Sequence, residues 1–289
     1  MADSGKRMQV KSLDSREYKL LLRPDDFAGD TMAEQANRLW RDIVVPVVET
    51  LDRTQTGGCR HRGSFKLADQ RPIQYWDTAA HDLDRLDLSL RLRGSNPAEL
   101  TLKYRMPDLF VVAEAAARHA GGKPSLEEDI APLEVQRGPG EVAMPMSPSM
   151  RSRFAWSEDR SPPNKLPATL AQLARFFPLV KTRLKQDPAK GADSSPLRSR
   201  TEFDEYVFRG PSVDFGGKAK GRFAFTLWFL RGETGQARVA ELSWRCEFGK
   251  SPMPGRSAMR AYQLFLGLQR QLGPLLDDKN SSKTKLALP

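Results

Sequence analysis

Apolar and polar positions alternate along several stretches of the chain, which is the pattern of a half-buried β-strand. In residues 88–93 every second position is leucine, and the positions between them are Ser89, Arg91 and Arg93. Residues 99–105 repeat this alternation. The Asn-Pro dipeptide between the two stretches is a turn signal, so we predict that they form a β-hairpin.

Similar patterns divide the rest of the chain into strands and helices. Helical spacing of apolar residues predicts helices over residues 27–52, 108–119, 166–177 and 257–276. A kink is expected at Pro46 in the first of them. Further strands are predicted at residues 10–22, 60–66, 73–78, 179–185, 198–209, 221–230 and 238–248.

Such a series of strands favours an antiparallel sheet, because strands close in sequence tend to pair. Closing that sheet into a barrel would remove its exposed edges. The expected fold class is therefore α+β, an antiparallel closed barrel with peripheral helices. We predict a single domain over residues 8–276, with an irregular insertion at about 138–165 and a flexible C-terminal tail at 277–289.

The chain is strongly basic, with 46 lysines and arginines against 36 acidic residues and a net charge of +10. This charge indicates an anionic partner, which could be nucleic acid, anionic lipid or a phosphorylated small molecule. Two cysteines make no disulfide framework, and no apolar run is long enough to span a membrane. We expect a cytoplasmic protein without a membrane partner.

Cations recur in pairs two residues apart, and this spacing places both members on one face of a strand. Several such faces lining one sheet would repel one another unless an anion lay between them. Arginine offers a planar fork for phosphate oxygens and lysine a point charge. These pairs are the predicted phosphate ligands: Arg91 with Arg93, Lys103 with Arg105, Lys181 with Arg183, and Arg198 with Arg200.

Carboxylates accompany these cations at the same two-residue spacing. Glu17 precedes Lys19, and Glu127 precedes Asp129. In the last predicted strand, one face carries Glu241, Ser243, Arg245 and Glu247. Carboxylates beside a phosphate-binding surface are explained if Mg²⁺ bridges the two, because this ion is usually held by one or two carboxylates and substrate phosphates. The simpler alternative is a solvated strand face with surface ion pairs.

An ordered series of short motifs resembles the CYTH superfamily of triphosphate tunnel metalloenzymes. That family shows a Tyr-x-Asp-Thr element, a Leu-Arg-x-Arg strand and a Leu-Thr-x-Lys strand. The matching residues are Tyr75–Thr78, Leu90–Arg93 and Leu100–Lys103. The family's opening Glu-x-Glu-x-Lys corresponds to Ser15–Lys19, and later matches are 181–183 and 240–242.

The resemblance implies an eight-stranded antiparallel tunnel that binds a triphosphate, a polyphosphate or a nucleoside triphosphate together with Mg²⁺ or Mn²⁺. It assigns phosphate binding to Lys19, Arg91, Arg93, Lys103 and Arg183, and the paired spacing adds Arg105, Lys181 and Arg200. Metal binding falls to Glu17 and Glu241, with Glu247 as a further ligand on the same face. The catalytic group would comprise Glu17, Glu127, Asp129 and Glu241.

Two positions depart from the family pattern, because Ser15 and Ser243 each replace a carboxylate. The leading hypothesis is a metal-dependent hydrolase of inorganic triphosphate or a related triphosphate. The two serines support an alternative, a polyphosphate-binding module without catalysis. An adenylyl-cyclase-like activity is a third hypothesis. Nucleic-acid binding is less favoured, because helix-turn-helix, zinc-ligand and aromatic RNA-binding patterns are missing from the sequence.

Overall fold

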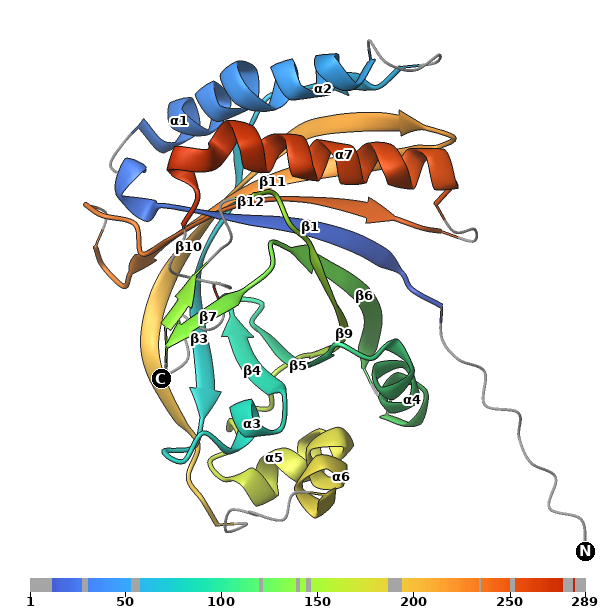
Figure 1. The fold of residues 1–289 in the computed structure, drawn as a ribbon. Coiled ribbons are helices and arrows are strands. Elements are labelled where there is room, and N and C mark those ends of the chain that lie inside the picture. Colours follow the sequence, from blue (N-terminus) through green and yellow to red (C-terminus); the bar gives the residue numbers. More distant parts are fainter. Residues whose placement is uncertain are drawn as a thin grey trace, which may run out of the picture.

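A closed β-barrel forms the centre of the protein (Figure 1). The structure is a computed structural model that describes residues 12–27, 31–52, 58–119, 122–138, 141–143, 147–186, 194–233, 235–249, 253–277 and Lys283. Within these ranges nine strands follow one another around the barrel in the order β11-β12-β1-β6-β9-β5-β4-β3-β10, and the pairing of β10 with β11 closes it. The predicted α+β barrel is therefore confirmed.

The barrel strands vary in length from six residues to nineteen. They are β1 (Ser15–Leu22), β3 (Lys66–Asp77), β4 (Leu88–Arg93), β5 (Glu99–Met106), β6 (Lys123–Ala131), β9 (Arg151–Arg160), β10 (Arg198–Gly216), β11 (Ala219–Leu230) and β12 (Val239–Glu247). The short β2 (Arg60–Arg62) extends the sheet beside β10, while β7 (Val135–Gly138) and β8 (Glu141–Ala143) form a separate pair.

Three details of the predicted barrel need correction. The described barrel has nine strands instead of eight, and β1 pairs with β6 in parallel, so the barrel is mixed. The predicted irregular insertion at 138–165 is wrong for Arg151–Arg160, which form β9 between β5 and β6. This strand escapes the pattern because four successive residues, 155–158, are buried, so apolar and polar positions do not alternate there.

The helices lie outside the barrel. They are α1 (Met32–Leu39), α2 (Val45–Asp52), α3 (Asp82–Arg85), α4 (Leu109–His119), α5 (Leu170–Phe176), α6 (Pro178–Gln186) and α7 (Gly255–Leu272). A π-helical turn, Trp40–Val44, joins α1 to α2. It lies just before Pro46, which has no N–H to donate to the carbonyl four residues back. No helix in the described ranges is long and apolar enough to cross a membrane.

Residues 179–185 were predicted as a strand, and this prediction is wrong because they lie in α6. Pro178 occupies the first helical position, where its missing N–H costs nothing. Val180 and Leu184, one helical turn apart, are both buried. The two-residue spacing of Lys181 and Arg183 therefore does not place them on a strand face.

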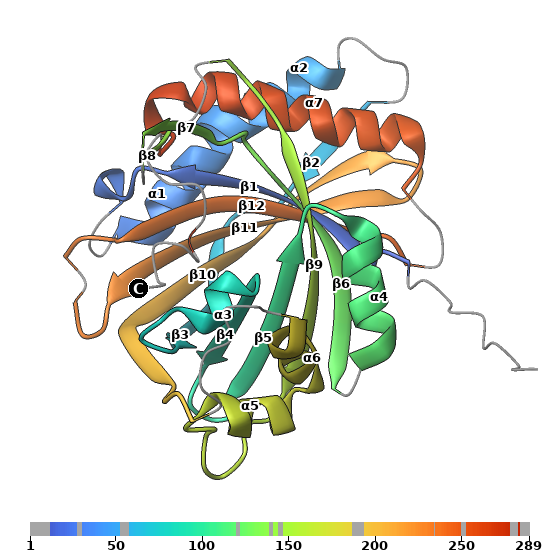
Figure 2. The same cartoon turned by 60° about the horizontal axis from the view of Figure 1, so that its bottom comes forward.

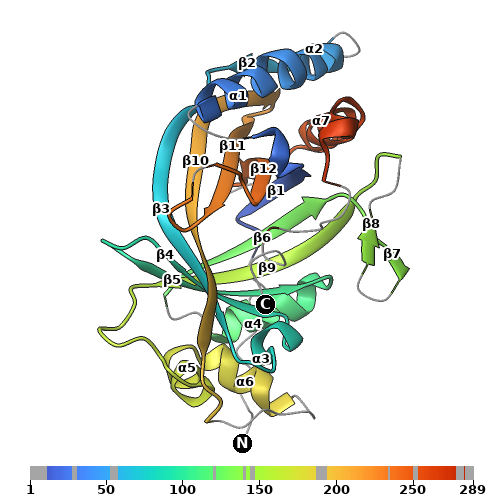
Figure 3. The same ribbon diagram turned by 90° about the vertical axis from the view of Figure 1, so that its left-hand side faces the viewer.

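Two hydrophobic layers cover the outer surface of the barrel. Helices α1, α2 and α7 pack against the outer faces of β1, β11 and β12, around Trp244, Phe225 and Phe265 (Figures 1 and 2). Helices α3 to α6 gather around the other part of the wall (Figure 3), where Leu88 and Leu90 of β4 and Leu100 and Leu102 of β5 are buried. Because the apolar positions of each strand face these helices, the alternate positions must face the interior.

Candidate functional site

The interior of the barrel contains a cavity of about 640 Å³, to which all nine barrel strands contribute. Its lining is dominated by ionisable side chains. Among the described residues the cationic ones are Lys19, Arg71, Arg91, Arg93, Lys103, Arg105, Lys123, Arg209, Arg222, Arg245 and Lys283, and the acidic ones are Glu17, Glu99, Glu127, Asp159, Glu205, Glu241 and Glu247. Eleven cations against seven carboxylates leave a surplus of positive charge.

The hairpin β4–β5 supplies the cationic wall that its alternation predicts. Arg91 and Arg93 of β4 and Lys103 and Arg105 of β5 all line the cavity. The residues between them, Leu92 and Tyr104, pack in the outer hydrophobic layer, where Tyr104 is buried and Leu92 is partly buried. Arg91 Nη2 donates to Thr101 Oγ1 at 3.1 Å, whereas its Nε is buried with no hydrogen-bond partner in the described part of the chain. The wall therefore presents donors that an anion could satisfy.

Burial among other cations makes these charges costly. Burial lowers the pKa of Arg93 to about 10, and the neighbouring charge of Arg91 adds to this effect. Burial also lowers the pKa of Lys103 to about 8, against the opposing attraction of Asp129. An anion bound beside Lys103 would favour its charged form and raise this pKa.

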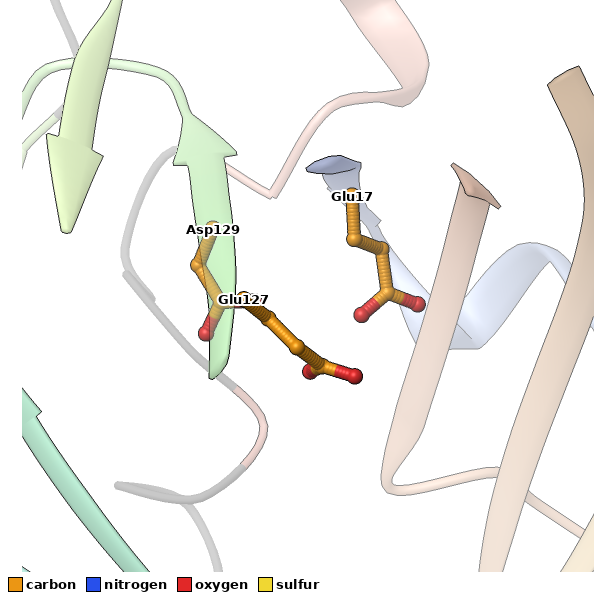
Figure 4. A group of neighbouring side chains, drawn as sticks. All are labelled: Glu17, Glu127 and Asp129. Carbon is orange, nitrogen blue, oxygen red and sulfur yellow. The ribbon is translucent and has the colours of Figure 1, made fainter. Parts of the chain in front are cut away.

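Beside the cations of β5, strands β1 and β6 bring three carboxylates together. Glu17 of β1 pairs in register with Asp129 of β6, and Glu127 lies two residues before Asp129. Oxygen atoms of the three side chains lie within 4.8 Å of one another. Figure 4 shows Glu127 extending from β6 toward the carboxylate of Glu17. We call Glu17, Glu127 and Asp129 the acidic triad.

Cations of the barrel wall neutralise the acidic triad. Lys19 Nζ lies 2.7 Å from Asp129 Oδ1 and 3.0 Å from Glu17 Oε2. Arg105 Nη2 lies 3.0 Å from Asp129 Oδ2, and Arg245 Nη2 lies 2.9 Å from Glu127 Oε1. Burial acts to raise the pKa of Glu17, but the charges of Lys19 and Arg245 outweigh it and hold this pKa at about 2.

The acidic triad fits a divalent metal in its chemistry. Burial acts against ionisation of Asp129, yet the nearby charges of Lys103 and Lys19 hold its pKa well below the usual range, so it is ionised at neutral pH. Ionised carboxylate oxygens are the ligands that Mg²⁺ and Mn²⁺ prefer. The three residues are therefore able to hold such an ion together with phosphate oxygens.

Two further carboxylates, Glu205 of β10 and Glu241 of β12, are more deeply buried than the acidic triad. Their side chains are 2% and 3% exposed. Arg71 Nε donates to Glu205 Oε2 at 2.8 Å, and Trp228 Nε1 donates to Glu205 Oε1 at 3.1 Å. Burial acts to raise the pKa of Glu205, but the charges of Arg93, Lys283 and Arg71 hold it at about 2. We call Glu205 and Glu241 the buried pair.

Beyond the buried pair the inner wall becomes apolar. Five strands continue their inward-facing positions with residues that form one cluster: Leu21, Ile73, Tyr75, Phe203, Trp228 and Val239. The alternation that places Glu205 and Glu241 inside places Phe203 and Val239 inside as well. Charged and apolar segments of the interior therefore follow one another along the same strands.

No protein-family model and no curated protein match this sequence. Among solved structures, a protein from Hippeastrum, described as a candidate adenylyl cyclase with a dominant triphosphatase activity, is similar over 93% of both chains, with 16% identity and a TM-score of 0.41. A candidate adenylate cyclase from Vibrio parahaemolyticus is similar over 93% of this chain and 96% of that one, with 14% identity and a TM-score of 0.32.

A candidate adenylate cyclase from Bacillus halodurans has 9% identity and a TM-score of 0.36 over 94% of this chain and 97% of that one. At these identities and scores the likenesses carry no argument about function. The functional argument rests on the cavity. The chain has the closed β-tunnel that the CYTH resemblance predicts. We refer to the cavity as the tunnel from here on.

The tunnel brings together most of the residues that the sequence singles out. Those that line it are Lys19, Arg91, Arg93, Lys103, Arg105, Glu17, Glu127, Glu241 and Glu247, and Asp129 bonds to Lys19 beside them. Glu247 pairs with Arg222 at 2.5 Å. Its side chain is 60% exposed, much more than the side chains of the acidic triad. The two serines that depart from the family pattern, Ser15 and Ser243, are both buried on inward-facing positions.

Lys181 and Arg183 do not belong to this group, because α6 holds them outside the tunnel. Arg183 instead lies over the ring of Tyr104, with its guanidinium carbon 5.0 Å from the ring centroid. Arg198 begins β10 and is exposed, and Arg200 follows on the same strand, although its side chain lies outside the described part.

Sequence reasoning missed several tunnel residues. Arg71 escaped because the predicted strand began at Ile73, whereas β3 begins at Lys66 and carries the alternation back through Arg71. Glu205 lay within a predicted strand, and its inward position follows from the alternation with Phe203 and Val207. Lys283 had no such signal, because it lies in the stretch predicted as a flexible tail; the neighbouring residues 278–282 and 284–289 lie outside the described residues.

Proposed function

We propose that the tunnel binds a linear triphosphate or polyphosphate with Mg²⁺ or Mn²⁺, and that the protein hydrolyses a triphosphate. The observation that carries this proposal is the composition of the wall. Ten cationic side chains from the barrel strands, together with Lys283, line one cavity of about 640 Å³. Their mutual repulsion, relieved in part by seven carboxylates, is best relieved further by a polyanion.

The arrangement of charge suits a chain of phosphates. Arg91, Arg93 and Lys103 lie on the adjacent strands β4 and β5, so their donors form a continuous surface and not a single point. The acidic triad adjoins this surface, on β1 and β6, and Lys103 Nζ lies 3.4 Å from Asp129 Oδ2. A phosphate chain bound along this surface would contact its guanidinium and ammonium groups and would share a divalent ion with the adjoining carboxylates.

Within this proposal each residue has a separate task. Arg91, Arg93 and Lys103 bind and orient the phosphates, and Glu17, Glu127 and Asp129 would hold the ion. When bound, the ion would neutralise phosphate oxygens and stabilise the charge that develops during phosphoryl transfer. A carboxylate of the triad that is not engaged with the ion would orient the attacking water and accept its proton.

A substrate panel tests the proposal. Tripolyphosphate, ATP, thiamine triphosphate and long-chain polyphosphate are each incubated with Mg²⁺ or Mn²⁺, and release of phosphate, pyrophosphate and cyclic nucleotide is measured. We expect phosphate release from at least one triphosphate, and none with EDTA. Cyclic nucleotide from ATP would replace the hydrolase by the cyclase hypothesis, and no binding of any of the four would end the proposal.

A matched pair of arginine variants locates the binding surface. Arg91→Ala should weaken tripolyphosphate binding by at least about tenfold, because a buried charge-assisted contact is lost. Arg183→Ala removes the same side chain from outside the tunnel and should leave binding within about twofold. Equal affinities of the two variants, measured by calorimetry, would contradict the tunnel as the binding site.

The alternative of binding without catalysis is favoured by one observation. Lys19, Arg105 and Arg245 already lie within 3.0 Å of acidic-triad oxygens, so the triad is neutralised without any ion. A protein of this kind would bind tripolyphosphate with equal affinity in EDTA and in Mn²⁺, and would release no phosphate. Calorimetry with and without the metal therefore separates the two hypotheses.

A further inference from the structure

Lys283 enters the tunnel from a part of the sequence that forms none of the barrel strands. Its Nζ donates to Glu241 Oε1 at 2.6 Å, and the side chain is only 20% exposed. The ammonium also lies 5.6 Å from the centroid of the Trp228 ring. Lys283 is counted among the residues that line the tunnel.

The surroundings of this ammonium form a built site for a cation. Glu241 is buried, with a side chain 3% exposed, and its ion pair with Lys283 is the closest approach of a cation to it in the described ranges. Glu205 contributes a second negative charge, since Lys283 is among the cations that hold its pKa low. The face of Trp228 completes the site, because the ring quadrupole attracts cations.

Glu241 is also connected to the rest of the tunnel. Leu21 of β1 is its register partner. Lys19 lies two residues before Leu21 on the same face, and the charge of Glu241 contributes to raising its pKa. Lys19 in turn contacts Asp129 and Glu17 of the acidic triad. The carboxylate that Lys283 occupies therefore belongs to the same charge network as the proposed metal site.

We propose that Lys283 is an internal competitor of the tunnel, which occupies the Glu241 carboxylate until a divalent cation and a polyphosphate displace it. An ammonium 2.6 Å from Glu241 Oε1 and a divalent ion at the same carboxylate would repel each other, so occupancy by either weakens binding of the other. A buried carboxylate without a cation is strongly disfavoured, so Lys283 should leave only when another cation replaces it. The proposal concerns regulation of the site described under the proposed function and rests on it.

Metal binding without any phosphate tests the competition directly. Mn²⁺ is titrated calorimetrically into the wild-type chain, Lys283→Ala and Lys283→Met. Because an intramolecular competitor lowers the apparent affinity by the fraction of time it occupies the site, both variants should bind Mn²⁺ about tenfold more tightly or bind an additional ion. Lys285→Ala, which removes an equal charge two residues further along, serves as the control and should match wild type.

A second measurement uses the unmodified chain, so it does not depend on the folding of a variant. Acetylation of lysine amines is followed at Lys283 by mass spectrometry, with the exposed Lys218 as the internal reference. We expect Lys283 to be protected, and its acetylation to rise several-fold relative to Lys218 when Mn²⁺ and tripolyphosphate are added together.

The outcomes separate this inference from the proposed function. Unchanged or weaker Mn²⁺ binding by both Lys283 variants would overturn the competitor. Weaker tripolyphosphate binding by the same variants would also overturn it, and would make Lys283 a phosphate ligand. If no phosphate compound binds wild type, the proposed function fails, while tighter Mn²⁺ binding by Lys283→Ala would still show that the ammonium excludes a cation.

Discussion

The acidic triad and the buried pair are made of the same chemical group, yet they are neutralised in different ways. The triad receives its cations from the barrel wall, since Lys19, Arg105 and Arg245 belong to β1, β5 and β12. In the buried pair, Glu205 is also served by the wall, through Arg71 and Arg93. Glu241 instead pairs with Lys283, which lies outside the barrel strands.

This difference shows that burial alone does not decide the role of a carboxylate. Cations fixed on adjacent strands are present whenever the barrel is folded, so a carboxylate beside them keeps its ion pairs. In the competitor proposal, the contact of Glu241 with Lys283 opens without unfolding the barrel, because Lys283 belongs to none of its strands. The first arrangement suits a constant ligand set, and the second suits exchange.

The largest effect is expected from the triad. Glu127→Gln should weaken Mn²⁺ binding by at least about 100-fold and abolish tripolyphosphate hydrolysis, because a metal ligand loses its charge. Glu99→Gln, which removes another carboxylate of the tunnel lining, serves as the control and should change the affinity little. Equal metal affinities of the two variants, measured by calorimetry, would remove the distinction between the triad and other tunnel carboxylates.

A smaller effect is expected on stability from the buried pair. The pKa of Glu205 falls from an ordinary value of 4.5 to about 2 on folding, so its charge contributes about 3 kcal/mol above pH 4.5. This contribution is lost as the pH falls from 4.5 toward 2. Glu205→Gln should therefore lower the free energy of unfolding by this order at pH 7, with a difference that shrinks in acid.

Denaturant titrations of Glu205→Gln and wild type at several pH values provide the measurement. Glu202→Gln, on the same strand but 46% exposed, should change the free energy of unfolding by less than about 0.5 kcal/mol. A Glu205→Gln difference that stays constant down to pH 2 would show that the side chain acts through packing and not through charge.

A pH effect on ligand binding is expected from Lys103, which pairs with the triad from the cationic side. Its pKa of about 8 lies below the ordinary 10.5, so Lys103 loses its charge as the pH rises through 8. Tripolyphosphate binding should weaken by up to about tenfold between pH 7 and pH 9 in wild type, since one cationic contact is lost. Lys103→Met should bind weakly and without this pH step, and a step that persists in the variant would assign it to another group.

The smallest effect is expected outside the tunnel. Arg183→Ala removes the contact with the Tyr104 ring and should cost about 0.5–1 kcal/mol of stability. Thermal unfolding measures this loss, with Lys181→Ala, an exposed residue of the same helix, as the control. A large loss of ligand affinity in Arg183→Ala would restore the phosphate-binding role that its place on α6 argues against.

Much of the inner wall was predictable from the sequence. The alternation in β4 and β5 placed Arg91, Arg93, Lys103 and Arg105 on one face, because a strand has a fixed period of two. The same rule held for Glu17 and Lys19 in β1. It failed for residues 179–185, where a two-residue cation spacing occurs on a helix, because spacing carries no information until the backbone conformation is known.

What the sequence determined by itself is which residues share a strand face, since this depends only on local backbone geometry. Tertiary structure alone decided which faces meet. It paired β1 with β6 in parallel and so brought Glu17 beside Asp129, about 110 residues away along the chain. It also brought Lys283 to Glu241. No strand or helix period in the sequence predicts this contact. It depends on the closed barrel interior and on the buried charge of Glu241, which needs a cation.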